Sequence, residues 1–116
     1  MAENQIFSDI IDGLMPGMVV DASGEIAVIV DVLRSQFTET VCLFVRFPRN
    51  VGNARPYDVL EVSPERTLGV EQWRPATQEA LEERLAARRH WLEGELSRLL
   101  EMVAPSTFVR ETVASD

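Results

Sequence analysis

Few side chains in this sequence could carry covalent or acid–base chemistry. His90 is the only histidine and Cys42 the only cysteine among 116 residues. A histidine can serve as a general base or pH switch near neutrality, and a thiolate can serve as a nucleophile. His90 lies within a helical pattern, where we expect a surface position. Cys42 lies in the apolar run 41–44, where we expect a buried and inert thiol.

No motif for catalysis or cofactor binding accompanies these residues. One cysteine and one histidine cannot form a tight zinc site or an internal disulfide. The sequence contains no GxxxxGK[ST], GxGxxG or nucleophile-elbow pattern. Carboxylates are plentiful, but neighbours such as Glu82 and Glu83 diverge by about 100° on a helix, and a dyad of Asp58 with Glu61 has no further support. We therefore predict a non-enzymatic protein without cofactor or metal.

Charge is distributed unevenly along the chain. The formal net charge is -8, which argues against coating nucleic acid or an anionic membrane by bulk charge. Residues 1–33 hold acidic residues and no basic one: Glu3, Asp9, Asp12, Asp21, Glu25 and Asp31. Residues 34–56 carry the opposite local charge. An acidic chain of this size also fits a phage or mobile-element inhibitor that mimics DNA, which composition permits without selecting it.

A loop at residues 47–56 is a candidate anion-binding site. Arginine forks and backbone N–H groups can hold a phosphate or an acidic side chain. The candidate residues are Arg34, Arg46, Arg49, Asn53 and Arg55. With Phe47 or Tyr57 as stacking surfaces, such a loop could serve a nucleic-acid-binding SH3/KOW-like barrel. The alternative is a long hairpin loop with ordinary turn chemistry.

The elements that would position these residues follow from hydrophobic periodicity. Residues 1–15 are predicted to contain a short helix, over 3–14, with one apolar face. Its members are Ile6, Phe7, Ile10, Ile11 and Leu14. Gly13 and the Pro16-Gly17 pair end it.

Residues 17–74 read as short strands separated by turn signals. The predicted strands cover 18–21, 26–33, 41–47, 57–62 and 69–73. The second of these is apolar at successive positions, which predicts a central strand covered on both faces. About five short strands indicate a small SH3-like antiparallel β-barrel. The predicted class is α+β.

A long helix is predicted within residues 75–104, and 105–116 form a flexible tail in which 107–113 could add an edge strand. Thr77 is a candidate N-cap and Pro105 stops the helix. At about 1.5 Å per residue the rod is roughly 40 Å long, against about 22 Å for a barrel of this size. The barrel alone therefore cannot bury the whole apolar stripe of the helix.

This stripe is the candidate partner-binding surface. In heptad terms Leu85, Leu92 and Leu99 occupy the a positions, and Arg88 and Glu95 interrupt the d positions. The candidate residues are Leu81, Leu85, Arg88, Trp91, Leu92, Glu95, Leu96 and Leu99. In an antiparallel pair centred near Leu92, Arg88 of one helix would face Glu95 of the other. Alternatively, both residues simply border a narrower apolar face in solvent.

The sequence therefore predicts a small acidic interaction protein of the cytoplasm. It would form a homodimer or dock on a larger protein through the helix, and the N-terminal helix is a third possible cover for the stripe. The sequence has no run of roughly 20 apolar residues that could span a bilayer.

Overall fold

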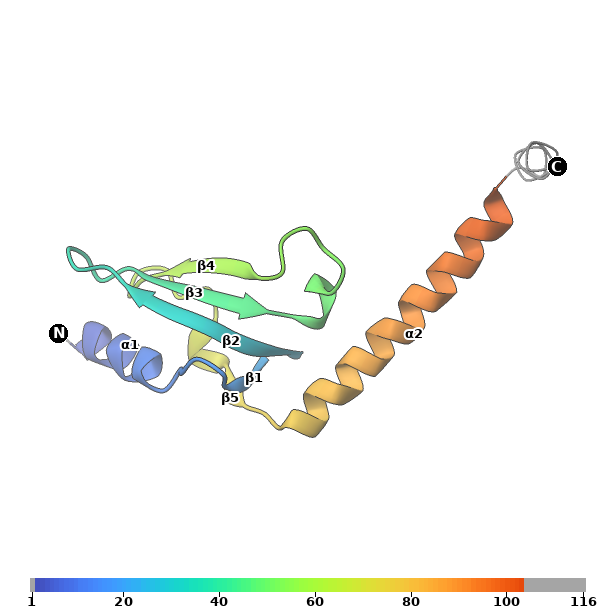
Figure 1. Cartoon of the computed structure of the whole chain (residues 1–116). Coiled ribbons are helices and arrows are strands. Elements are labelled where there is room, and N and C mark those ends of the chain that lie inside the picture. The colour runs from blue at the N-terminus through green and yellow to red at the C-terminus, as the bar shows by residue number, and fades with distance from the viewer. Residues whose placement is uncertain (1, 104–116) are drawn as a thin grey trace, which may run out of the picture. The chain divides into compact units, whose positions relative to one another are not determined.

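The computed structural model describes residues 2–103 and confirms the α+β class (Figure 1). A short helix precedes an antiparallel five-stranded sheet, and one long helix follows. The elements are α1 (Ala2–Asp12), β1 (Val19–Ala22), β2 (Glu25–Arg34), β3 (Val41–Arg46), η1 (Pro48–Asn50), β4 (Asp58–Val62), η2 (Val70–Gln72), β5 (Arg74–Pro75) and α2 (Gln78–Met102). The tail and edge strand predicted beyond Pro105 lie outside the described residues.

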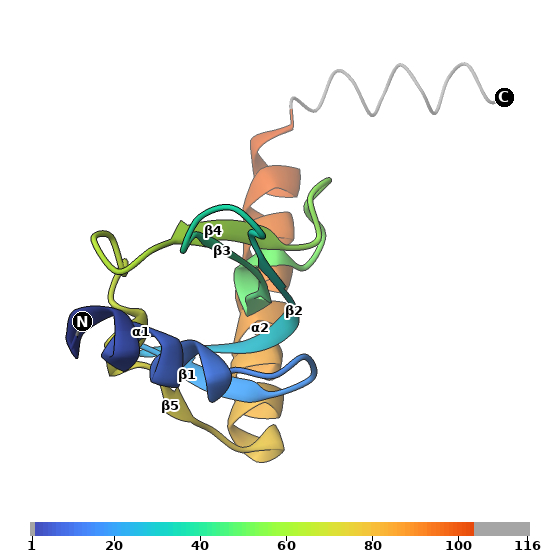
Figure 2. The same ribbon diagram turned by 90° about the vertical axis from the view of Figure 1, so that its left-hand side faces the viewer.

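The strands form an open sheet. Their order is β4-β3-β2-β1-β5, so β4 and β5 are the two edges. Figure 2 shows the sheet curving from β4 and β3 through β2 to β1 and β5. Within residues 2–103 the edges do not pair with each other, because β5 has only two residues and both pair with β1. The predicted closed barrel is therefore not confirmed.

The chain divides into two compact units inside α2. The first runs from the N-terminus to Leu85 and the second begins at Ala86. The first contains the sheet, α1 and the start of α2, and the second contains the rest of α2.

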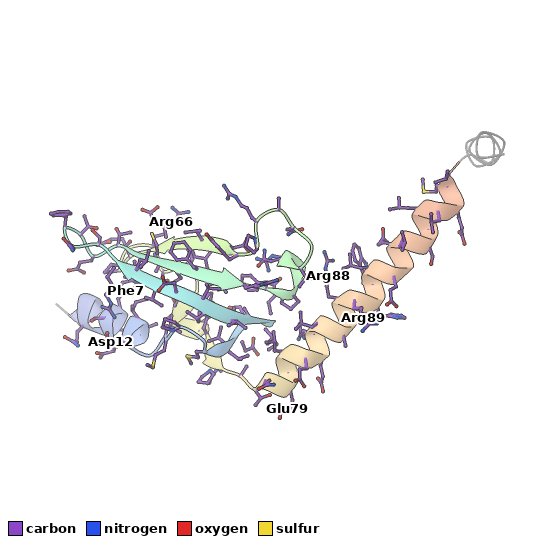
Figure 3. The ribbon with its side chains drawn as sticks, in the orientation of Figure 1. Phe7, Asp12, Arg66, Glu79, Arg88 and Arg89 are labelled. Atoms are coloured by element: carbon purple, nitrogen blue, oxygen red, sulfur yellow. The ribbon has the colours of Figure 1, made fainter. Side chains whose placement is uncertain are left out.

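Helix α1 covers one face of the sheet. Phe7, Ile11 and Leu14 are buried in the same cluster as the inward residues of β2 and β3, and Figure 3 shows Phe7 reaching from α1 toward the sheet. Their spacing of four and three residues places them on one side of the helix. Ile6 is 59% exposed and is not part of this core, so the predicted apolar face of α1 is narrower than expected.

A β-bulge in β2 explains why one prediction for this strand is wrong. The strand is central, as predicted, but its register with β3 shifts between Ile29 and Asp31. The extra residue reverses the alternation of side chains. Ile29, before the shift, is buried, whereas Val30 and Leu33, at and after the shift, are exposed at 43% and 51%. Ile26 and Ala27 are both buried, so the start of the strand is covered on both faces as predicted, but the described part beyond the bulge is not.

The predicted strand at residues 69–73 is also wrong. Leu68 and Gly69 have φ angles of 54° and 82°, which extended strands do not adopt. The chain instead forms η2, whose Val70 enters the core. The hydrogen bond from Thr67 and the backbone N–H of Glu71 lower the pKa of the exposed Glu71 carboxyl.

Candidate functional site

Helix α2 begins as the sequence predicts. The Thr77 hydroxyl oxygen accepts a hydrogen bond of 3.1 Å from the Ala80 N–H, which is the N-cap arrangement. Glu79 lies in the first turn, where the partial positive charge of the helix end favours a carboxylate. The 25 residues of the helix extend for about 37 Å at 1.5 Å per residue. The helix is therefore long enough to present a continuous interaction surface.

The apolar stripe of α2 is exposed to solvent. No residue of the helix is buried in the described structure. Leu85 and Leu92 are each 37% exposed, and Leu96 and Leu99 are each 58% exposed. Leu81 is half-buried. A row of exposed leucines on one side of a helix is a typical surface for another apolar face.

These leucines occupy a narrow arc of the helix. At about 100° per residue, all members of the stripe fall within an arc of about 60° that includes Leu92. The members are Leu81, Leu85, Leu92, Leu96, Leu99 and, one residue beyond the helix, Val103. His90 and Ser97 lie on the opposite side by the same geometry. His90 is exposed, as expected for a surface histidine.

Charged residues along the stripe have different partners within the helix. The guanidinium carbon of Arg88 lies 4.6 Å from the centre of the Trp91 ring, within the range of a cation–π contact. Arg89 pairs with Glu93 at 3.2 Å, and Glu95 pairs with Arg98. Figure 3 shows Arg88 and Arg89 on different sides of α2. Arg88 has no ion pair among residues 5–103, and its Nε atom is buried without a hydrogen-bond acceptor there.

In the candidate anion-binding loop, Arg49 is already engaged. Its guanidinium forms an ion pair with Glu25 and a second one, of 2.8 Å, with Asp58. The guanidinium carbon also stacks 3.9 Å from the centre of the Phe47 ring. Carboxylates thus occupy donors that a phosphate would require.

The other predicted residues of this loop are dispersed. Arg34 pairs with Asp12 of α1 at 2.5 Å, far along the sheet from the loop. Asn53 donates its side-chain amide to the Arg49 carbonyl at 3.0 Å. Arg46 and Arg55 are exposed and form no ion pair within the described residues. The structure therefore does not gather the five predicted residues into one site.

An open pocket of about 430 Å³ lies between α1 and the β2–β3 connection. Its walls are polar and apolar in about equal parts, and the Arg34 side chain in them is paired with Asp12. The lining residues are Gln5, Phe7, Ser8, Arg34, Ser35, Thr38, Glu39, Thr40 and Val41. Sequence patterns did not predict this pocket, because it joins segments about 30 residues apart. Its hydroxyl groups offer hydrogen bonds but no acid–base pair.

Groups that could bind a metal ion do not cluster in the described residues. Cys42 is free and, unlike the buried thiol expected from sequence, only half-buried, because it points to the face of the sheet opposite α1. No group of three histidine, cysteine or acidic side chains lies in a position to hold a metal ion there. Among these same residues, no helix has the length and apolarity to cross a membrane.

Comparisons with protein-family models, with curated proteins and with solved structures found no match. The functional argument therefore rests on the chain's own chemistry.

Proposed function

We propose that this chain is a small, non-enzymatic interaction protein that binds another polypeptide through the leucine stripe of α2. The observation that carries the proposal is the exposure of Leu85, Leu92 and Leu99 along one side of a 25-residue helix. Removing such side chains from water is worth roughly 1.5–3 kcal/mol for each one fully buried. Several leucines in one row therefore provide a substantial driving force for association.

Trp91 and Arg88 support the same surface. Tryptophan and arginine are enriched among the residues that contribute most to protein–protein binding. Trp91 is 50% exposed and stacks with Arg88 beside the leucines. The pair supplies a large, rigid contact at the border of the stripe.

A nucleic-acid-binding role for an SH3-like barrel over residues 17–74 has weaker support. Two of its arginines, Arg34 and Arg49, have carboxylate partners, which leaves Arg46 and Arg55 for phosphates. A DNA-mimicking acidic surface has a similar difficulty, because Asp12 and Glu25 are the partners of those arginines. Cytoplasmic location remains a prediction from sequence.

The proposal is tested by placing a charge in the stripe. Leu92→Glu puts a carboxylate within the apolar arc, where burial of a charge is unfavourable. We expect this variant to lose association by at least tenfold, measured as a light-scattering mass above 13.0 kDa or as capture of a protein from nuclease-treated lysate.

Ser97→Glu is the matched control, because it adds the same charge on the opposite side of α2. It should behave as the unaltered chain. If Leu92→Glu and Ser97→Glu kept the same mass and the same captured proteins as the unaltered chain, the stripe would not be a binding surface. Recovery of nucleic acid, with its proteins released by nuclease, would favour the loop arginines instead.

A further inference from the structure

We propose, building on the function above, that the occupant of the stripe is α2 of a second copy of this chain, packed antiparallel about a two-fold axis at Leu92. The stripe is symmetric about this residue. Leu85 and Leu99 lie seven residues on either side, and Leu81 and Val103 lie eleven residues on either side. An antiparallel pair centred there would place Leu92 against Leu92, Leu85 against Leu99, and Leu81 against Val103.

One position breaks the symmetry of the stripe. Leu96 lies four residues after the centre, and Arg88 lies four residues before it. At that level of the antiparallel pair, Leu96 of one copy and Arg88 of the other would lie on opposite sides of the seam, where the aliphatic stem of Arg88 would extend the apolar contact, since arginine stems commonly cover apolar surface. The guanidinium would remain at the edge of the contact, beside Trp91.

The charges favour this orientation. Arg88 and Glu95 are seven residues apart, so they project from nearly the same side of the helix. We call the two sides of the stripe its flanks, and Arg88 and Glu95 lie on the same one. In an antiparallel pair with this two-fold axis, each flank faces the same flank of the partner. Arg88 would lie about 1.5 Å along the axis from the level of the partner's Glu95. Because of the two-fold axis, the pair of Arg88 with the Glu95 of the other copy occurs twice in the dimer.

A parallel pair in register would do the reverse. Opposite flanks would then meet at the same level, so Arg88 would lie beside Arg89 of the partner. Like charges in these positions oppose association. The apolar side chains alone permit either orientation, and the charges select the antiparallel one.

Arg88 is also in a suitable state for such a contact. Arg89 and Glu95 have partners within their own helix. Arg88 has only the Trp91 ring, and its Nε lacks an acceptor among the described residues. The partner's Glu95 supplies a carboxylate for this donor, and Glu95 can accept from Arg98 and Arg88 together because a carboxylate has several acceptor sites.

The experiment uses two single charge reversals in the full chain. Glu95→Arg gives a copy with arginine at both positions, and Arg88→Glu gives a copy with glutamate at both. Each variant alone would face like charges across the two-fold axis, and their 1:1 mixture would restore two opposite pairs. We expect each variant alone to self-associate roughly tenfold more weakly than the unaltered chain, about 1.4 kcal/mol, and the mixture to recover that loss.

The mixture is the decisive sample. Each substitution affects its own helix equally whether the variant is alone or mixed, so only contacts between helices can differ between these samples. Ser97→Arg, on the opposite side of α2, should leave self-association unchanged. Circular dichroism of each variant confirms that α2 remains helical. A mixture that associates no better than its components would overturn the antiparallel arrangement.

A cross-linking measurement checks the orientation without altered charges. With Cys42 replaced by serine, Leu85→Cys and Leu99→Cys copies should form a disulfide with each other and little with themselves. Disulfides within each variant alone would indicate parallel pairing. A chain that stays at 13.0 kDa at all concentrations would overturn self-pairing, whereas the proposed function would still stand if Leu92→Glu, but not Ser97→Glu, lost a stoichiometric protein partner.

Discussion

Asn50 is the polar residue that the fold buries within residues 5–103. Its side-chain oxygen accepts a hydrogen bond of 2.6 Å from the Phe47 N–H, and its amide donates to Asp58 at 3.4 Å. These bonds connect the end of β3, the turn η1 and the start of β4. Because the loop of Arg49 lies between these points, Asn50 holds that loop in place.

We predict that Asn50→Ala lowers the free energy of unfolding by about 1–3 kcal/mol, because it leaves the buried Phe47 N–H without an acceptor. Asn53→Ala removes an exposed hydrogen bond from the same loop and should change stability by less than about 0.5 kcal/mol. Urea denaturation of both variants measures the difference. Equal losses of unfolding free energy in the two variants would show that the buried hydrogen bonds of Asn50 do not stabilise the fold more than an exposed one.

The carboxylate partners of Arg49 could not be predicted from the sequence. The types of residue in the loop suggested carboxylate or phosphate recognition, and Arg49 pairs with two carboxylates of its own chain. However, the carboxylates come from Glu25 and Asp58, 24 residues before and 9 residues after Arg49. Spacing along the chain does not predict these ion pairs, because they depend on how β2 and β4 are placed beside β3.

Among the elements, α1 contributes to stability through a small number of contacts. It buries Phe7, Ile11 and Leu14 in the core, together with Val70 of η2. This packing also bears on the alternative in which α1 covers the leucine stripe. The apolar residues that α1 would need for that role lie against the sheet.

We predict that Ile11→Ala lowers the free energy of unfolding by about 2–5 kcal/mol, because Ile11 is 1% exposed and its truncation leaves a cavity. Ile6→Ala is the control in the same helix, with an expected effect below about 0.5 kcal/mol at this exposed position. Thermal or chemical denaturation compares the two. A similar loss for both would contradict the observed orientation of α1.

Most elements could be predicted, because their signals are local. The cap at Thr77, the apolar positions of α1 and the apolar run that forms β3 each depend on neighbouring residues. Two errors came from features that local patterns do not show. The bulge at Val30 depends on register with β3, and η2 depends on the left-handed conformations of Leu68 and Gly69.

Across the whole chain, charge that is separated in sequence becomes paired in the fold. The acidic first third supplies Asp12 and Glu25, and two of the arginines that follow, Arg34 and Arg49, are their partners. The leucine stripe of α2 is an exposed apolar feature that has no role inside the described residues. Helical periodicity and length were enough to predict this stripe as a binding surface. They do not identify the partner, because the partner lies in a second chain.

Amide hydrogen exchange at a series of protein concentrations tests the central claim most directly. If α2 pairs with a second copy, protection of amides around Leu85–Leu99 should decrease on dilution, while protection in β2 and β3 should stay constant. Protection of α2 that equals that of the sheet at every concentration, in a chain whose mass stays at 13.0 kDa, would mean that the chain covers its own stripe. Unprotected α2 at every concentration would also contradict pairing between copies.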